Sequence, residues 1–287
     1  MQKLGPNDLV MGGIPIAHVP FLDRFAPAAR AGFKGISMGP RDLWQLEVEG
    51  KSAADARARA ADHGMELREM DCICCWTPSH EKLTGDGELV QVLKSLQADP
   101  VLEAAARLGA ASVTVVDMMG PMLSFDECVE GFAMLCDKAA ALGLRVHIEF
   151  LPWGSIPDLM TAWRIIDAVG KPNGGLTVDT WHFFRSGSKL DDLANIPGEK
   201  IFTVQINDAP AKATANLMEE CMVARLTPGK GDFDLPGFIQ ALDRSGSQAP
   251  IEVEVFHASL ANTPIDSIAQ DWAGAARALL TSARNKG

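Results

Sequence analysis

The sequence has no long apolar run, few cysteines and no basic leader. No window approaches the roughly 18 consecutive apolar residues of a membrane-spanning helix, so we expect no membrane segment. The first residues, MQKLGPNDLV, lack a basic patch followed by an apolar core, so we expect no signal peptide and a cytoplasmic protein. Six cysteines in 287 residues are too few for a disulfide scaffold, and we expect reduced thiols.

Positive charge is also scarce. Lys and Arg number 26 against 37 Asp and Glu, which gives a formal net charge of −11. Such a surface repels phosphate backbones, so nucleic acid is not an expected partner, whereas a metal cation or a small molecule is. The chain also lacks a P-loop pattern, so nucleotide binding is not indicated.

No stretch rich in Pro, Gly and Ser divides the chain, and instead one unit recurs along it. In segments such as LEAAARLGAASVTVVD and DKAAALGLRVHIEFL, Ala and Leu at helical spacing lead to a Gly, which suits the left-handed position that ends a helix. A run rich in Val, Ile, Thr and Phe follows, with the length of a strand. Strands that alternate with helices imply parallel pairing through right-handed crossovers.

Counting these units predicts a single α/β domain over residues 1–287, a (β/α)8 TIM barrel. Barrels of this type commonly use about 250 residues as one domain. The predicted strands cover residues 8–16, 32–39, 64–72, 111–119, 144–151, 175–182, 201–208 and 250–256. The predicted helices lie near residues 21–31, 52–62, 99–109, 125–142, 157–169, 189–195, 235–245 and 266–284.

Polar residues occur late in four consecutive predicted strands. The site of such a barrel lies at the C-terminal ends of its strands. Glu149, Asp179, Gln205 and Glu254 each have apolar strand neighbours, so the period of two makes them project opposite to those neighbours, into the barrel. Any one of them alone is better read as an ordinary strand-end polar group. Four at equivalent depth on successive strands favour a joint site.

Three carboxylates and an amide in one low-dielectric space indicate a bound cation. Buried acids cost several kcal/mol each and repel one another, which raises their pKa values unless a cation lies among them. All-oxygen ligation suits Mn²⁺ or Mg²⁺, whereas Zn²⁺ more often brings His or Cys. We therefore predict one divalent ion, Mn²⁺ or Mg²⁺, held by Glu149, Asp179, Gln205 and Glu254.

At these residues the sequence resembles the sugar phosphate isomerase/epimerase family, the xylose-isomerase-like TIM barrels. The motifs that carry the resemblance are HIEFLPWGSI, GLTVDTWHFFRSG, FTVQINDAP, RLTPGKGDFDLPGFIQAL and IEVEVF. Members hold one divalent ion with Glu, Asp, His and Glu from these strands, which by position implies Glu149, Asp179, Gln205 and Glu254 as ligands. A dimer or tetramer is common in that family.

The chain departs from the epimerase pattern at one ligand position. Gln205 stands where epimerases usually have His, and this Gln is similar to that of the metal-dependent 3-dehydroshikimate dehydratases of the same superfamily. Those enzymes also have a His three residues after the Asp, here His182, and an Arg before the Pro-Gly loop, here Arg225. The related endonuclease branch binds three zinc ions through many histidines, and GDFD replaces its Asp-x-His motif here, which argues against a nuclease.

Further side chains are candidates for contact with substrate. His182 is either a proton carrier and ligand or a satisfied loop histidine. Arg225 and Lys230 flank LTPGKGDF, a turn that could hold an anionic oxygen, although part of it simply leads into the next helix. The rings of Trp153 and Trp181 could wall the pocket or pack in loops. Arg68 is a further candidate.

These residues predict an enzyme that removes a proton next to a carbonyl of a small hydroxy-carbonyl, sugar-like substrate. Glu149 or Glu254 would accept the proton, and the other acid or His182 would return it, through a metal-bound enediolate. Isomerase or epimerase chemistry ranks first. A lyase of the 3-dehydroshikimate dehydratase type ranks second because of Gln205. A metal-dependent binding protein without turnover is the third alternative.

Overall fold

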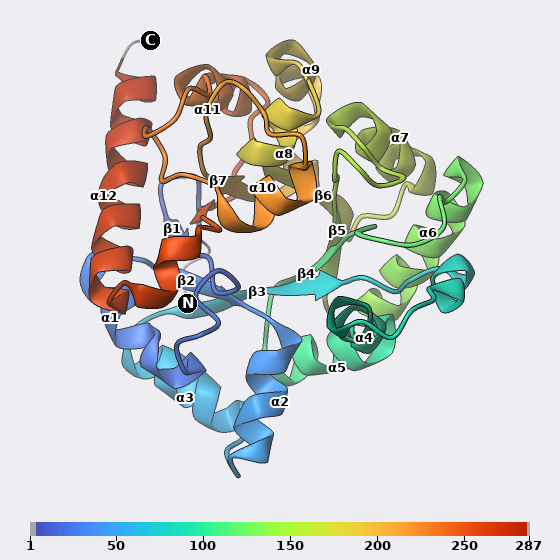
Figure 1. Cartoon of the computed structure of the whole chain (residues 1–287), viewed down its shortest axis with the longest axis horizontal. Coiled ribbons are helices and arrows are strands. Elements are labelled where there is room, and N and C mark those ends of the chain that lie inside the picture. Colours follow the sequence, from blue (N-terminus) through green and yellow to red (C-terminus); the bar gives the residue numbers. More distant parts are fainter. Residues whose placement is uncertain (1–3, 286–287) are drawn as a thin grey trace.

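Eight parallel strands form a closed barrel in the computed structural model, which describes residues 4–285. Each strand pairs with the next along the chain, and β8 pairs with β1 to close the barrel (Figure 1). The strands are β1 (Leu9–Met11), β2 (Gly35–Met38), β3 (Glu66–Ile73), β4 (Ser112–Val115), β5 (Arg145–Glu149), β6 (Gly174–Asp179), β7 (Ile201–Ile206) and β8 (Ile251–Val253). The predicted (β/α)8 barrel is confirmed.

Helices surround the barrel on the outside (Figure 1). They are α1 (Phe25–Ala31), α2 (Pro40–Val48), α3 (Ala53–Asp62), α4 (Glu88–Ser95), α5 (Ala98–Leu108), α6 (Phe125–Ala141), α7 (Leu159–Val169), α8 (Thr180–Arg185), α9 (Leu190–Asn195), α10 (Leu217–Val223), α11 (Leu235–Arg244) and α12 (Ile265–Arg284). Four short 3-10 helices complete the set: η1 (Phe21–Asp23), η2 (Pro78–Lys82), η3 (Gly198–Lys200) and η4 (Ala258–Asn262).

The glycine stops of the sequence have the expected local geometry. Gly109 ends α5 with a φ of 74°, and Gly170 ends α7 with a φ of 63°. Both values lie in the left-handed region, which only Gly adopts at little cost. At the opposite end of α7, the Asp158 side chain accepts a hydrogen bond from the Thr161 N–H, which starts the helix.

Alternation along β5 explains how acids come to lie inside the barrel. Val146 and Ile148 are buried and belong to the hydrophobic core. His147 and Glu149 project to the opposite face and are also buried, so the barrel has a polar interior. Deeper in this interior, the Glu69 carboxylate accepts hydrogen bonds from Thr114 (2.5 Å) and from Thr203. Side-chain hydroxyls there replace the water that a buried acid would otherwise need.

The sequence located all eight strands but missed four helices, α2, α4, α8 and α10. The predicted strand 175–182 was wrong in its last residues, because β6 ends at Asp179 and α8 begins at Thr180. The Asp179 side chain accepts a hydrogen bond from the His182 N–H and so starts the helix directly at the strand end. The predicted reduced thiols agree with six free cysteines.

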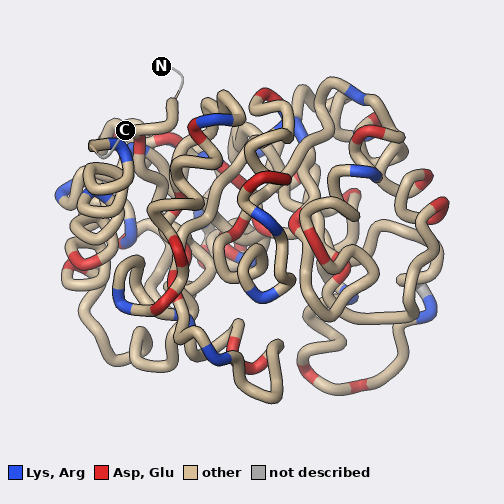
Figure 2. The backbone as a smooth tube through the Cα atoms, turned by 90° about the horizontal axis from the view of Figure 1, so that it is seen from above, with Lys and Arg blue, Asp and Glu red and all other residues tan. Residues whose placement is uncertain are grey.

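The outer surface carries charges of both signs. Figure 2 shows Lys and Arg positions interleaved with Asp and Glu positions around the periphery of that view. Among the helices of residues 4–285, none combines the length and hydropathy that a membrane crossing requires.

Candidate metal centre

The four predicted ligands lie together at the C-terminal ends of consecutive strands. Glu149 ends β5, Asp179 ends β6, Gln205 lies in β7 and Glu254 follows β8 directly. Asp179 is in register with Gln205, and all four side chains are buried. The strand ends therefore bring three acids and an amide to one end of the barrel, as the sequence predicted.

Asp179 is the most heavily bonded of these acids. One carboxylate oxygen, Oδ1, accepts the His182 N–H at 3.0 Å. The other, Oδ2, accepts hydrogen bonds from Asn207 Nδ2 at 2.7 Å and from Arg225 Nη1 at 3.0 Å. These bonds fix the carboxylate on both sides, so its orientation is set by the fold.

His182 faces the same point as the acids. Its Nε2 lies 3.5 Å from Glu149 Oε1. Glu149, Asp179 and His182 each offer one ligand atom, and these atoms all lie within 4.8 Å of one another. One imidazole nitrogen therefore lies beside the carboxylates at this point.

Arg225 lies among the acids and carries the positive charge of the cluster. Its Nη1 contacts Asp179 Oδ2 at 3.0 Å and Glu254 Oε2 at 3.4 Å. Its Nη2 lies 3.2 Å from His182 Nε2 and donates to Cys221 Sγ at 2.9 Å. The guanidinium supplies one positive charge against three carboxylates, so most of the negative charge is not balanced by it.

The acids are hard to ionise in this surrounding. Burial, and then the neighbouring carboxylates, raise the pKa of Glu149 well above its ordinary value. Burial raises the pKa of Glu254 well above its ordinary value and also raises that of Asp179, although Arg225 opposes both shifts. Burial and the Arg225 charge lower the pKa of His182, so its imidazole is neutral. A neutral ring has one unprotonated nitrogen, which can accept a hydrogen bond or bind a cation.

Several polar atoms at this point fit a bound ion. Within the described part of the chain, both amide atoms of Gln205 and the Oε1 atom of Glu254 are buried without a hydrogen-bond partner. Buried polar atoms normally have partners, and unfilled ones point to an ion or a water. Oxygen atoms, one imidazole nitrogen and unbalanced negative charge are a donor set that suits a divalent cation.

Stability should depend on pH and on metal together. The pKa values of Glu149, Asp179 and Glu254 are raised on folding, so their stabilising contribution is fully present below the unfolded values, near 4.5 for the glutamates, and is lost as the pH rises through the raised values. A cation binds the deprotonated acids. Manganese chloride should therefore raise the melting temperature more at about pH 8 than at about pH 5. Equal shifts at both pH values would contradict this donor set.

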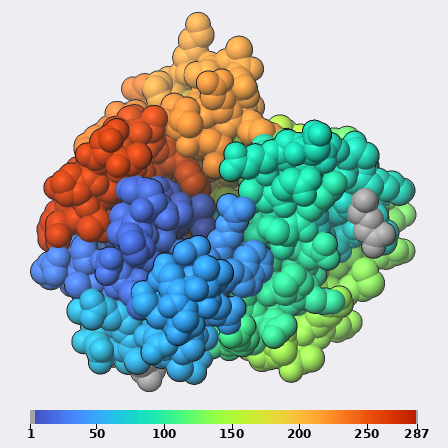
Figure 3. All heavy atoms as spheres, turned by 60° about the horizontal axis from the view of Figure 1, so that its bottom comes forward, coloured from blue at the N-terminus to red at the C-terminus, as the bar shows by residue number. Residues whose placement is uncertain are grey.

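A cavity of about 290 Å³ opens onto the cluster. Glu149, His182, Arg225 and Glu254 line it. Figure 3 shows the surface hollowed where the blue, teal and orange segments meet, which correspond to the stretches that line the cavity. Substrate could therefore reach these four side chains from solvent.

The structure brings together only some of the predicted substrate contacts. Trp153 lines the cavity and is held by a 3.0 Å hydrogen bond from its Nε1 to Met118 O. Trp181 is fully buried behind the site, and its ring packs against Trp153 with centroids 6.1 Å apart, so it does not line the cavity among the described residues. It supports Arg225, whose guanidinium carbon lies 5.7 Å from its ring centroid.

Lys230 and Arg68 lie away from the four predicted ligands. Lys230 is exposed and pairs with Asp271 at 2.8 Å. Arg68 is buried in β3 beside Glu69, deeper in the barrel. Neither is among the described residues that line the 290 Å³ cavity.

Sequence reasoning gave too little weight to two residues at the site. Asp71, late in β3, lines the cavity, and burial and the nearby Glu69 charge raise its pKa to about 7. Asn207 holds Asp179 and also donates to Glu254 O at 3.2 Å. Both were detectable, because Asp71 is another late-strand acid and Asn207 follows Gln205 at the strand period of two.

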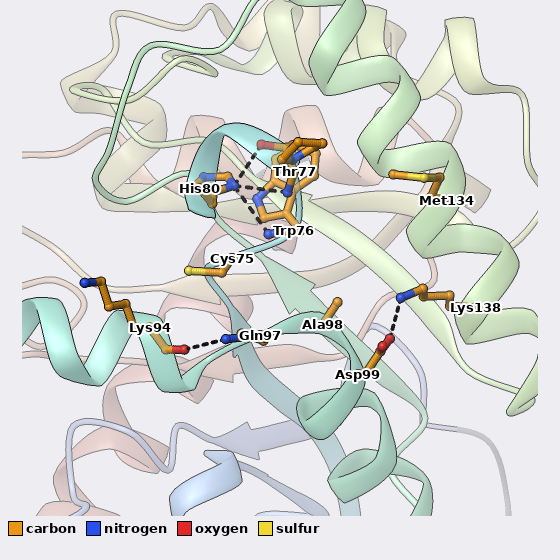
Figure 4. A pocket seen from close by; sticks show the side chains of 11 residues that line it. Cys75, Trp76, Thr77, His80, Lys94, Gln97, Ala98, Asp99, Met134 and Lys138 are labelled. Atoms are coloured by element: carbon orange, nitrogen blue, oxygen red, sulfur yellow. Dashed lines mark hydrogen bonds and ion pairs between the residues drawn. The ribbon is translucent and has the colours of Figure 1, made fainter. Parts of the chain in front are cut away.

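A second cavity, of about 520 Å³, lies outside the barrel near α4, α5 and α6. His80 Nδ1 faces the Trp76 and Thr77 N–H groups there, and Lys138 pairs with Asp99 (Figure 4). None of the predicted site residues is among the described residues that line it. The four predicted metal ligands therefore do not contribute to this second cavity.

A family model and several known proteins match this chain. The model, described as xylose isomerase-like TIM barrel, matches residues 25–282. The 3-dehydroshikimate dehydratase of Pseudomonas aeruginosa is 30% identical over 257 residues, which cover 87% of this chain and 38% of that protein. The chain thus spans less than half the length of that relative. The inosose isomerase of Bacillus velezensis is 26% identical over 232 residues, covering 78% of this chain and 79% of that protein.

A solved structure is similar over nearly the whole fold. The IOLI protein with a bound zinc atom superposes with a TM-score of 0.81 at 18% identity, covering 96% of this chain and 98% of that one. At this level of identity the likeness concerns the fold.

Proposed function

Because the chain belongs to the xylose isomerase-like TIM barrel family, we propose that it is a divalent-metal-dependent isomerase or epimerase acting on a small hydroxy-carbonyl substrate. The observation that carries this proposal is the convergence of Glu149, Glu254 and His182 with Arg225 at the floor of one cavity, where Arg225 also pairs with the buried Asp179. Such a floor has acids that can exchange protons and a cationic group that can bind a negatively charged oxygen.

The predicted ligands, Glu149, Asp179, Gln205 and Glu254, with His182 beside them, would hold the ion. The ion, Mn²⁺ or Mg²⁺, supplies Lewis acidity, which makes a proton next to a carbonyl easier to remove. A zinc atom is named for the similar IOLI structure, so Zn²⁺ belongs in the same titrations.

Different side chains remove the proton and return it. Glu149 and Glu254 both line the cavity, and a carboxylate with a raised pKa is a stronger base than an ordinary one. One accepts the proton, and the other, or His182, returns it. Arg225 keeps its positive charge beside the acids, and that charge stabilises the negative charge that develops on a substrate oxygen.

Dehydration is the second candidate, and Gln205 favours it. The amide lies at the third ligand position, in register with Asp179, and the dehydratase of P. aeruginosa matches 87% of this chain. The same proton removal followed by loss of a hydroxyl from the next carbon gives a lyase. A protein that binds the metal and the substrate without turnover is the third candidate.

Solvent deuterium separates these candidates. The Mn²⁺-loaded protein is incubated in D₂O with inosose and with 3-dehydroshikimate, and an aliquot treated with EDTA serves as the control. We expect deuterium at the carbon next to the carbonyl, and we expect EDTA to abolish it. A rearranged or inverted ketone supports the isomerase or epimerase, and loss of water supports the lyase. Binding without exchange or product would overturn enzymatic function with these substrates.

A further inference from the structure

The cavity above the candidate metal centre has two chemically different ends. Its polar side chains gather at the strand ends, where Asp71, Glu149, His182, Arg225 and Glu254 lie. The rest of its wall is largely apolar, and one side of it comes from α4 and from the segments that follow β4 and β5: Leu89, Val92, Leu93, Val116, Met118 and Trp153.

The polar groups that remain in the wall are largely occupied. The Asp42 carboxylate accepts hydrogen bonds from Arg24 at 2.7 and 3.1 Å and from the Gly39 N–H at 3.0 Å. The Trp153 N–H donates to Met118 O at 3.0 Å. Arg41 is exposed at the mouth of the cavity. Apart from Arg41, the wall therefore offers little to a ligand that carries a hydroxyl on every carbon.

The free energy of binding in this cavity favours a ligand with an apolar portion. A hydroxyl buried without a partner weakens binding by about tenfold to a hundredfold. A hydrocarbon portion gains instead, because it covers apolar side chains such as Leu89, which is 46% exposed on α4. The volume of about 290 Å³ is near the lower end of small-molecule sites, which begin at roughly 300 Å³. One ring with a few substituents suits such a space.

We propose that the substrate is an α-hydroxy ketone whose far side is hydrocarbon, alicyclic or aromatic, packed against α4 and the segment after β4. This refines the proposed function and rests on it. The carbonyl and its hydroxyl face Glu149, Glu254 and Arg225, while the hydrocarbon side contacts the wall formed by Leu89, Val92, Leu93, Val116, Met118 and Trp153. Specificity then comes from the wall, and reactivity from the strand ends.

Two ketones with the same ring test the refinement. 2-Hydroxycyclohexanone and inosose share a six-membered ring and an α-hydroxy ketone, and inosose carries hydroxyls on the remaining carbons. Dissociation constants are measured by calorimetry on the Mn²⁺-loaded full chain, and α-deuterium exchange is followed in parallel. We expect 2-hydroxycyclohexanone to bind at least about tenfold more tightly. Equal or tighter binding of inosose, or no binding of 2-hydroxycyclohexanone, would overturn the refinement. Absence of exchange with both ketones would instead overturn the proposed function.

Substitutions of two methionines, one inside and one outside the cavity, test whether the wall causes the difference in affinity between the two ketones. Met118 lines the cavity, whereas Met122, four residues later, is 72% exposed and outside its lining. Met118→Gln should raise the dissociation constant of 2-hydroxycyclohexanone about tenfold and leave that of inosose nearly unchanged. Met122→Gln should change neither. Equal weakening of both ketones by Met118→Gln would show that the wall does not discriminate, and the refinement would fail.

Discussion

Replacing Glu149 or Glu254 by Gln should lower kcat by about a hundredfold to ten-thousandfold while the barrel remains folded. Each substitution keeps the size of the side chain but removes a group that can accept a proton and carry negative charge. Deuterium exchange at the α-carbon measures the loss of proton transfer, and Mn²⁺ calorimetry measures the loss of metal binding. Melting temperatures of the variants report whether the fold is retained.

Glu252 provides the matched control for these substitutions. It lies in β8 two residues before Glu254, is equally buried, and accepts a 2.7 Å hydrogen bond from Ser37. Burial, and then the nearby acids, raise its pKa well above the ordinary value, which favours the protonated acid, and Gln is similar to that form in size and shape. Glu252→Gln should retain most activity. Near-normal turnover in both the Glu149 and Glu254 variants would refute the proposed proton transfer.

Arg225→Met should destabilise the metal-free protein by about 3–5 kcal/mol, because breaking a buried ion pair leaves its acids without a cation. Asp179 and Glu254 both contact this guanidinium. The free energy of unfolding, from urea titration, measures the loss. Added Mn²⁺ should recover part of it, since the ion supplies the missing positive charge.

Lys230→Met is the surface counterpart of this experiment. Lys230 pairs with Asp271 through side chains that are 58% and 43% exposed, and pairs of this kind contribute at most about 1 kcal/mol. If Arg225→Met cost no more than Lys230→Met, the guanidinium would not be balancing the buried acids.

Local patterns predicted the strands and the acids that they carry. Glycine stops such as Gly109 and Gly170 mark helix ends, and the period of two around Glu149 assigns its side chain to the barrel interior. Both signals lie within a few residues of the feature that they predict. For that reason the eight strands and the convergence of four late-strand residues could be predicted from sequence alone.

Contacts between distant segments were beyond such patterns. Arg225 reaches Asp179 because its backbone N–H bonds to Phe256 O at 2.9 Å, after β8, and its Nε donates to Cys221 O at 3.0 Å. No spacing in the sequence predicts these contacts of Arg225. Helix α4 is likewise a short helix between β3 and α5. The sequence alone does not show that its apolar side chains line the cavity.

The unequal contacts of Asp179 and Gln205 determine how far a substitution at each strand end disturbs the fold. Asp179 starts α8, holds Asn207 and binds Arg225 with one carboxylate, so any replacement disturbs three contacts together. The Gln205 amide forms no hydrogen bond within residues 4–285, so a substitution there breaks none, although the new side chain must still fit the buried space. Variation at position 205 is therefore limited mainly by the space inside the barrel, whereas variation at position 179 also breaks the contacts that start α8 and hold Arg225.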